Sequence, residues 1–269
     1  MEVHPLAGAL GAALVGVAVS RLSDRVFDSV PPALLEFGVI VLHGQSVTPA
    51  EQLAFAARWG EPHFHPYMPG LAEQPEVIEI VKAETDRHTF GGNWHTDQMF
   101  TDTPVRATML YAKEVPPKGG DTLFANAYLA YETLSDGMKK MLDGLFTRNT
   151  YNMQKNRATA MQVNDIEEKS VEAEHPLIRT HGETGRKAVY ISYDGITRNI
   201  VGLTEAESAP ILGYLRNHVT RPEFTYRFRW TEGSLAMWDN RCVQHLAIND
   251  YHGHRRDLRR VQLAGDRPV

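Results

Sequence analysis

Two stretches decide how this chain folds: Trp94-His95-Thr96-Asp97 and the later Trp238-Asp239-Asn240-Arg241-Cys242-Val243-Gln244-His245. In an extended strand, residues i and i+2 point to the same face. The imidazole of His95 and the carboxylate of Asp97 would therefore converge on one point, as two ligands of a metal ion must. We assign His245 as the third ligand, so the second stretch is expected to fold back onto the first.

Two histidines and one carboxylate, with the other coordination positions open, form the ligand set of non-haem Fe(II) oxygenases. A 2-oxo acid such as 2-oxoglutarate can fill two open positions, and O2 can take the last. The far carboxylate of 2-oxoglutarate needs a cation, and the guanidinium of Arg256, shortly after His245, can bind it through two parallel hydrogen bonds. A His-x-Asp tripeptide alone is weak in a chain with 12 histidines. Its combination with a distant histidine and a following arginine is far more specific.

At these residues the chain resembles the taurine dioxygenase / 2,4-dichlorophenoxyacetate dioxygenase family of Fe(II)- and 2-oxoglutarate-dependent oxygenases. The matching blocks occur in the family's order: Asn93-Trp94-His95-Thr96-Asp97, Gly119-Gly120-Asp121-Thr122-Leu123, Trp238–His245, and Arg255-Arg256 with Arg259-Arg260. The resemblance implies His95, Asp97 and His245 as iron ligands. It implies Thr122 and Arg256 as contacts to the far carboxylate of 2-oxoglutarate.

The resemblance also implies substrate contacts at His65 and Arg260. In the taurine branch, an arginine at the position of Arg260 holds the sulfonate. Gln98 stands where taurine enzymes carry a small apolar residue, and we expect it to contact the substrate. Three further positions depart from the taurine pattern: Met68 for tyrosine, Gly91 for asparagine and Ile196 for phenylalanine.

We therefore expect a small organic anion other than taurine, such as a sulfonate, a sulfate ester or a carboxylate like an aryloxyalkanoate. Hydroxylation would release succinate and CO2, and a hydroxylated carbon that bears a heteroatom would collapse and cleave that bond. Two alternatives stay open from the residues alone. Two histidines and an aspartate can bind zinc in a hydrolase, or the site can bind a metal or a 2-oxo acid without catalysis.

Composition bounds the remaining partners. The chain has 269 residues, 42% hydrophobic and 23% charged, and a net charge of -5. No long basic run occurs, so we expect no nucleic-acid partner. The apolar run 6–19 has no preceding Lys or Arg and is too short and glycine-broken for a membrane span. The single cysteine, Cys242, fits a reducing compartment and a small buried residue. We predict a cytoplasmic homo-oligomer, a dimer or tetramer, without membrane association.

Hydrophobic periods predict many strands and few helices. Strand patterns cover 37–43, 77–81, 105–113, 175–181, 187–193, 223–230, 234–238 and 258–263, and helical patterns cover 48–59, 128–134 and 138–145. Capping boxes begin at Thr48 and Thr204, although Pro210 favours a helix start near Ser208. These patterns favour a mainly β fold with flanking helices, and the resemblance implies a double-stranded β-helix (jelly-roll, cupin-like) core. We expect one domain over 1–269, with mobile loops near 63–93 and 151–174.

Overall fold

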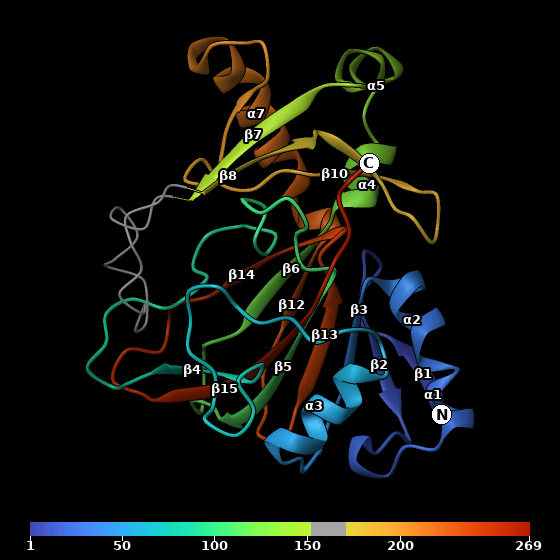
Figure 1. Ribbon diagram of the computed structural model, residues 1–269, viewed down its shortest axis with the longest axis vertical. Helices are drawn as coiled ribbons and strands as arrows, with labels where there is room; N and C mark the ends of the chain where they lie inside the picture. The colour runs from blue at the N-terminus through green and yellow to red at the C-terminus, as the bar shows by residue number, and fades with distance from the viewer. Residues whose placement is uncertain (152–170) are drawn as a thin grey trace.

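The structure is a computed structural model that describes residues 1–151 and 171–269. Its largest layer is a seven-stranded sheet with the order β1-β2-β3-β13-β5-β15-β4. Neighbouring strands within this sheet are antiparallel, except β2 and β3, which are parallel. The strands are β1 (Glu2–Pro5), β2 (Ala12–Val15), β3 (Val39–Leu42), β4 (Ile78–Lys82), β5 (Ala107–Glu114), β13 (Leu235–Asp239) and β15 (Arg256–Leu263). In Figure 1 the N-terminal hairpin forms one edge of this sheet and β4 the other.

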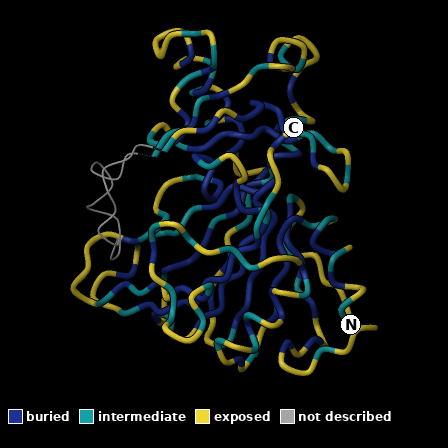
Figure 2. The backbone as a smooth tube through the Cα atoms, in the orientation of Figure 1, coloured by how far each residue is buried: buried dark blue, intermediate teal, exposed yellow. Residues whose placement is uncertain are grey.

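A second antiparallel sheet packs on the inner face of the first. It has the order β12-β6-β14 and consists of β6 (Thr122–Asn126), β12 (Thr225–Phe228) and β14 (Val243–Ala247). One hydrophobic cluster joins the two sheets and includes Val41, Leu110, Trp238 and Leu258 from the large sheet with Phe124, Phe228 and Val243 from the small one. Figure 2 shows this buried centre in dark blue. The space between the two sheets is where the site is built.

Helices cover the outer face of the large sheet. The run Val39–Leu42 is buried at every position because Val39 and Val41 face the inner cluster, whereas Ile40 and Leu42 face the outer one. That outer cluster includes residues of α2 (Val30–Phe37) and α3 (Pro49–Ala57). The capping box predicted at Thr48 is present, with Pro49 as the first helical residue.

A smaller layer of strands and helices stands above the two sheets in Figure 1. β7 (Phe146–Tyr151) lies between β8 (Val171–Pro176) and β11 (Thr197–Ile200), and β9 (Ile178–Thr180) pairs with β10 (Lys187–Val189). The other elements in the described ranges are η1 (Val19–Arg21), α1 (Asp24–Phe27), α4 (Ala127–Glu132), α5 (Asp136–Leu142), α7 (Glu205–Val219) and η2 (Pro222–Phe224). The chain is thus rich in strands with few helices, as predicted.

Two local predictions were wrong. α7 begins at Glu205 rather than near Ser208, because the capping box of Thr204 and Glu207 closes the first turn. Pro210 lies inside the helix, where it lacks an amide hydrogen to donate. The predicted irregular excursion 151–174 ends earlier than expected, since β8 starts at Val171. The part of that prediction at 152–170 lies outside the described residues. In the part of the chain that the structure describes, no helix is long and apolar enough to cross a bilayer.

Candidate active site

Three side chains with metal-binding atoms meet between the facing sheets. His95 pairs with His245 of β14 through an isolated antiparallel bridge, in which each backbone amide donates to the other residue's carbonyl oxygen at 3.0 and 2.8 Å. Asp97 Oδ1 lies 3.5 Å from His95 Nε2 and 3.7 Å from His245 Nε2. One ligand atom from each residue lies within 4.8 Å of the others. The second stretch therefore folds back onto the first, as the sequence indicated.

The backbone that presents these ligands is not the extended strand that we expected. Only His95 makes a strand-like pairing, and Asp97 begins a turn. In this turn Gln98 has a φ of 54°, the one positive value at a non-glycine residue within the described ranges. Such a conformation is unfavourable for an L residue and needs contacts that hold it. Gln98 Nε2 donates to Gln262 Oε1 at 3.0 Å, and Gln98 Oε1 lies 2.9 Å from His63 Nε2.

The orientation of the Asp97 carboxylate is fixed from behind. Its Oδ2 accepts from the Thr108 hydroxyl at 2.6 Å and from Gln262 Nε2 at 3.0 Å. The Thr108 oxygen in turn accepts from Asn240 Nδ2 at 2.9 Å, which directs its own hydrogen toward Asp97. These contacts leave Oδ1 as the oxygen that faces both histidines. Partners of this kind commonly set the geometry of a metal ligand.

Protonation states also suit metal binding. His95 Nδ1 donates to the Asn93 carbonyl at 2.6 Å, so in the neutral ring Nε2 carries a free lone pair. Burial, with a smaller effect of His95, lowers the pKa of His245 to about 3. Burial would raise the pKa of Asp97, but His245, His95 and Arg260 together hold it below its ordinary range. Imidazole nitrogens and a carboxylate are suitable ligands for a divalent transition metal such as Fe(II).

Aromatic rings lie around the guanidinium of Arg256, the first residue of β15. Arg256 is 4% exposed, and its Nε and Nη2 have no hydrogen-bond partner among the described residues. The rings of Trp230 and Tyr251 lie 5.7 and 6.0 Å from its Cζ. Thr122 Oγ1 accepts from Trp230 Nε1 at 3.0 Å, which leaves the hydroxyl hydrogen free to donate to an anion. Gly120 suits this position, because its φ is 69° and a Cβ would lie 3.3 Å from both Arg256 Cδ and Tyr251 Cδ1, which is a tight contact.

A small cavity of about 40 Å³ connects the Arg256 guanidinium with the metal ligands. Its lining includes His95, Asp97, His245, Thr122 and Arg256. An unpartnered buried cation is costly unless an anion joins it. The structure thus brings the five residues predicted for the metal and the 2-oxo acid around one cavity.

A larger cavity of about 380 Å³ opens beside the metal ligands and contains the residues predicted to touch substrate. Arg260 is buried, lines this cavity, and contacts Met68 Sδ through Nη2 at 3.3 Å. His65 Nδ1 accepts from the amides of Tyr67 and Met68 at 3.2 and 3.1 Å, so its Nε2–H is the available donor. Burial and Arg260 lower the pKa of His65 to about 3, so the ring is neutral.

Aromatic side chains form a large part of the wall of this larger cavity. Tyr151 stacks on Phe100 with ring centroids 4.7 Å apart and on Tyr67 at 6.0 Å. Tyr193 and Ile196 complete the wall. The cavity therefore has a cationic side at Arg260 and an extended apolar side, a combination that suits an anion with a hydrophobic body.

Comparisons with known proteins agree with this geometry. The model of the family described as "Taurine catabolism dioxygenase TauD, TfdA family" matches residues 2–262. The chain belongs to this family. It is an alpha-ketoglutarate-dependent (2-oxoglutarate-dependent) dioxygenase.

Among relatives of this TauD/TfdA chain is the alpha-ketoglutarate-dependent sulfate ester dioxygenase of Pseudomonas putida, 33% identical over 100% of this chain and 91% of that protein. The alkylsulfatase of Acinetobacter baylyi is 32% identical over 99% of this chain and 86% of that protein. The crystal structure of a taurine dioxygenase from Burkholderia xenovorans superimposes with a TM-score of 0.84 at 37% identity, covering 100% of this chain and 90% of that one.

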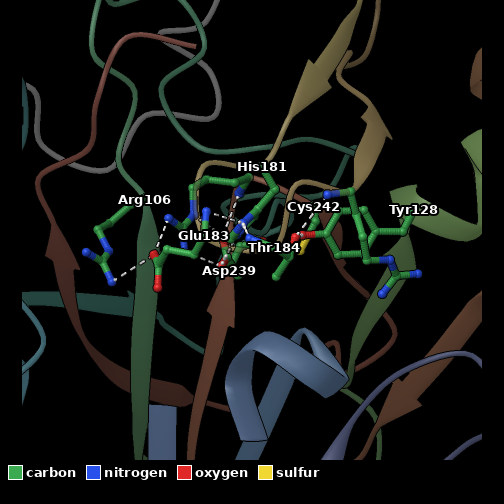
Figure 3. Close-up of polar contacts among 9 residues, drawn as sticks. Arg106, Tyr128, His181, Glu183, Thr184, Asp239 and Cys242 are labelled. Atoms are coloured by element: carbon green, nitrogen blue, oxygen red, sulfur yellow. Dashed lines mark hydrogen bonds and ion pairs between the residues drawn. The ribbon is translucent and has the colours of Figure 1, made fainter. Parts of the chain in front are cut away.

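In this TauD/TfdA chain, the segment before His245 is held by a buried ionic network (Figure 3). Asp239 is 1% exposed and accepts from Arg241 Nε and Nη2 at 2.8 and 2.7 Å and from His181 Nε2 at 3.0 Å. Glu183 accepts from Arg241 Nη1 at 2.6 Å. Cys242 is buried beside this network, as predicted, and burial raises the pKa of its thiol. The network fixes the turn between β13 and β14, and thereby the position of His245.

Sequence reasoning missed Thr108 and Gln262, the two residues that orient Asp97. Gln262 could have been predicted from the sequence, because residues at even spacings on a strand share one face. Gln262 therefore lies on the face of β15 that carries Arg256 and Arg260. Thr108 pairs with Gln262 across the sheet. No sequence signal points to that pairing before the strand register is known.

Proposed function

We propose that this dioxygenase uses Fe(II), 2-oxoglutarate and O2 to hydroxylate a small organic anion with an apolar body, such as an alkyl sulfate ester or a sulfonate. The observation that carries the substrate class is the larger cavity, which is lined both by Arg260 and His65 and by a group of stacked aromatic rings. The printed activities of the Pseudomonas and Acinetobacter relatives concern sulfate esters and support the same class. Carboxylates such as aryloxyalkanoates share the anionic head and form the second group to test.

Each side chain then has a distinct task in the proposed reaction. His95, Asp97 and His245 would hold the iron, and bound iron with 2-oxoglutarate supplies the oxidising power for C–H hydroxylation. Thr122 and Arg256 would bind the far carboxylate and so fix the orientation of the cosubstrate. Fixed orientation of the cosubstrate beside the iron would favour coupling of its oxidation to that of the substrate.

Substrate placement would come from the larger cavity. Arg260 would bind the anionic head with His65 Nε2–H as a second donor, and the aromatic wall would hold the apolar body. Gln98 lines the same cavity, but both ends of its amide are engaged by Gln262 and His63. Its proposed role is therefore to shape the cavity floor beside Asp97 rather than to bind the anion. A hydroxylated carbon bonded to sulfate oxygen would break down to an aldehyde and sulfate.

The direct test is an anaerobic titration of the apo-protein with Fe(II) and 2-oxoglutarate, followed by the weak visible absorption of the chelate. The absorption is expected in the wild-type protein and is expected to vanish in His95→Ala. A panel of hexyl sulfate, hexanesulfonate, phenoxyacetate and taurine is then assayed for succinate release in air. Iron-bound protein that shows no absorption with 2-oxoglutarate would contradict the proposal.

Arg256→Ala is expected to weaken 2-oxoglutarate binding by roughly ten-fold or more, because charged hydrogen bonds contribute about 1.5–3 kcal/mol. Iron affinity should stay nearly intact, since Arg256 contributes no metal-binding atom. Pyruvate is the internal control, because it chelates through the same keto acid group but lacks the far carboxylate. Its affinity should be the same in both proteins. An equal loss for pyruvate and 2-oxoglutarate would show that the substitution acts elsewhere.

Arg260→Met is expected to raise KM for hexyl sulfate on the order of ten-fold or more, since it removes the cation that would pair with the anionic head. Affinity for 2-oxoglutarate should change little, because Arg256 remains. Arg198→Met provides a matched control at an exposed arginine that pairs with Glu205. Succinate release against hexyl sulfate concentration is the measurement. An unchanged KM for hexyl sulfate in Arg260→Met would contradict the assignment of Arg260 as the residue that binds the anionic head.

We further propose that the two facing sheets are a double-stranded β-helix and that one domain spans 1–269. The shared hydrophobic cluster between the sheets supports both proposals. The dimer or tetramer stays a prediction, and light scattering after size exclusion would test it. The cytoplasmic location also stays a prediction. The alternative of a zinc hydrolase is set aside, because the chain belongs to a family of dioxygenases. A hydrolase also needs no 2-oxo acid, so the buried Arg256 would have no anionic ligand.

A further inference from the structure

A third cavity lies next to Arg256, apart from the metal ligands. Its volume is about 800 Å³, and it is bounded by β4 and by the segment 86–90 that follows it. None of His95, Asp97 and His245 lines it, whereas Arg256 lines both this cavity and the small one at the metal ligands. Arg256 therefore stands between the two. The proposed reaction assigns no role to this third cavity.

The cavity contains a second buried cation, Lys82, the last residue of β4. Lys82 is 4% exposed, and its Nζ has no hydrogen-bond partner among the residues that the structure describes. It is the direct cross-strand partner of Arg256 on β15, so both side chains project from the same face of the sheet. The ring of Tyr251 contacts both heads, at 4.5 Å from Lys82 Nζ and 6.0 Å from Arg256 Cζ.

One buried carboxylate, Asp121, lies close enough for its charge to act on Arg256, and its Oδ2 accepts from Arg227 Nε at 2.6 Å while its Oδ1 has no hydrogen-bond partner among the described residues. The other acidic groups near the pair have partners of their own. Glu79 accepts from Lys113 Nζ at 2.6 Å. Asp86 Oδ2, at the exposed rim of the cavity, accepts from the Ala83 amide at 2.8 Å. Like charges directly opposite each other on neighbouring strands destabilise a sheet, and burial increases that cost. The Tyr251 ring and the charge of Asp121 offset part of this cost, and an anion between or beside the two cations would offset more of it.

We propose that Lys82 and Arg256 form a two-cation site whose ligand is a carboxylate. Two sources share that chemistry: the far carboxylate of metal-bound 2-oxoglutarate, and a separate small carboxylate held in the third cavity. The proposal rests on the placement of 2-oxoglutarate at Arg256 given above. In both cases Lys82 binds carboxylate oxygen through its ammonium, and its stem stays on the Tyr251 ring.

The test compares Lys82→Met with Lys113→Met. Methionine keeps an apolar stem on Tyr251 and removes the charge. Lys113 lies in the same sheet, but its ammonium pairs with Glu79 and Asp257, so its loss should not affect carboxylate binding. For each iron-loaded protein, the dissociation constant of 2-oxoglutarate is measured anaerobically from the chelate absorption. Succinate, which cannot chelate through a keto group, is titrated calorimetrically with and without saturating 2-oxoglutarate.

If the cosubstrate is the source, Lys82→Met raises the 2-oxoglutarate dissociation constant by roughly ten-fold, and Lys82→Arg restores most of the affinity. If a separate carboxylate is the source, 2-oxoglutarate binding is unchanged, but succinate binds the wild-type protein in the presence of 2-oxoglutarate and does not bind Lys82→Met. Unchanged binding of both ligands in Lys82→Met overturns the proposal.

Thermal unfolding of the ligand-free protein supplies an independent readout. Removal of one of two unpaired buried cations should raise the unfolding temperature of Lys82→Met above that of the wild type. A structural role for the ammonium predicts the opposite shift. Absence of the chelate absorption in the wild-type protein would instead contradict the proposed function, and the succinate titration of the same protein would still test Lys82.

Discussion

Asp97→Asn is expected to abolish iron-dependent turnover, although the substitution changes a single oxygen to an amide nitrogen. In the wild-type protein, Asp97 Oδ2 accepts two hydrogen bonds, from the Thr108 hydroxyl and from Gln262 Nε2. An asparagine must place its carbonyl oxygen there, because its NH2 group cannot accept them. The NH2 group then faces His95 and His245, where it cannot bind a metal.

Iron affinity should fall by at least about 100-fold, since loss of a partner behind a metal ligand already costs roughly 10–100-fold. The measurement is Fe(II) binding under anaerobic conditions, with the 2-oxoglutarate absorption as a second readout. Asp102→Asn, the same change at an exposed position close by, is the control and should bind iron as the wild type does. The fold should persist in Asp97→Asn because both hydrogen bonds remain. Retention of wild-type iron affinity would show that Asp97 is not a ligand.

Asp239→Ala is expected to lower the free energy of unfolding by about 3–5 kcal/mol, the usual cost of breaking a buried ion pair from one side. Asp239 accepts two hydrogen bonds from the Arg241 guanidinium and one from His181 (Figure 3). Its removal leaves buried donors without an acceptor. Because the network fixes the turn before His245, iron affinity should fall as well, even where the variant is folded.

Urea unfolding of the wild type, Asp239→Ala and Asp143→Ala is the measurement. Asp143 pairs with Lys187 at the surface, so its loss should cost at most about 1 kcal/mol. Equal destabilisation by the two substitutions would contradict the importance assigned to the buried network.

The difference in unfolding free energy between the wild type and Asp239→Ala is also expected to depend on pH. Burial alone would raise the pKa of Asp239, but the hydrogen bonds from Arg241 and His181 hold it well below its ordinary range. A lowered pKa stabilises the folded state above the unfolded pKa of about 3.9, and this contribution is lost as the pH falls below it. The difference between wild type and Asp239→Ala should therefore be constant near neutral pH and shrink in strong acid.

Residue type and order were enough to identify the metal ligands as candidates, because few ligand sets combine His-x-Asp with a later histidine and arginine. The expected geometry was right in outcome but wrong in its cause. His95 and Asp97 do not converge through a regular strand. They converge because a single bridge to His245 holds one side chain, and a turn with Gln98 in a left-handed conformation directs the other.

Strand positions were also predictable where one period dominated. The run around Val39–Leu42 and the last strand, Arg256–Leu263, were found within a few residues. The start of α7 was not, since two local preferences competed: the capping box at Thr204 favoured an early start, and Pro210 a late one. Short-range patterns do not state which of two such preferences is stronger.

The sequence by itself determined the chemistry of the site: two imidazoles, one carboxylate and two arginines on a strand that ends the fold. The tertiary structure decided which side chains orient the Asp97 carboxylate and which side chain lies across the sheet from Arg256. Thr108 and Gln262 reach Asp97 only through the register of β5 with β15, and Lys82 meets Arg256 only through the register of β15 with β4. Strand register depends on contacts between residues far apart in the chain, which local patterns do not encode.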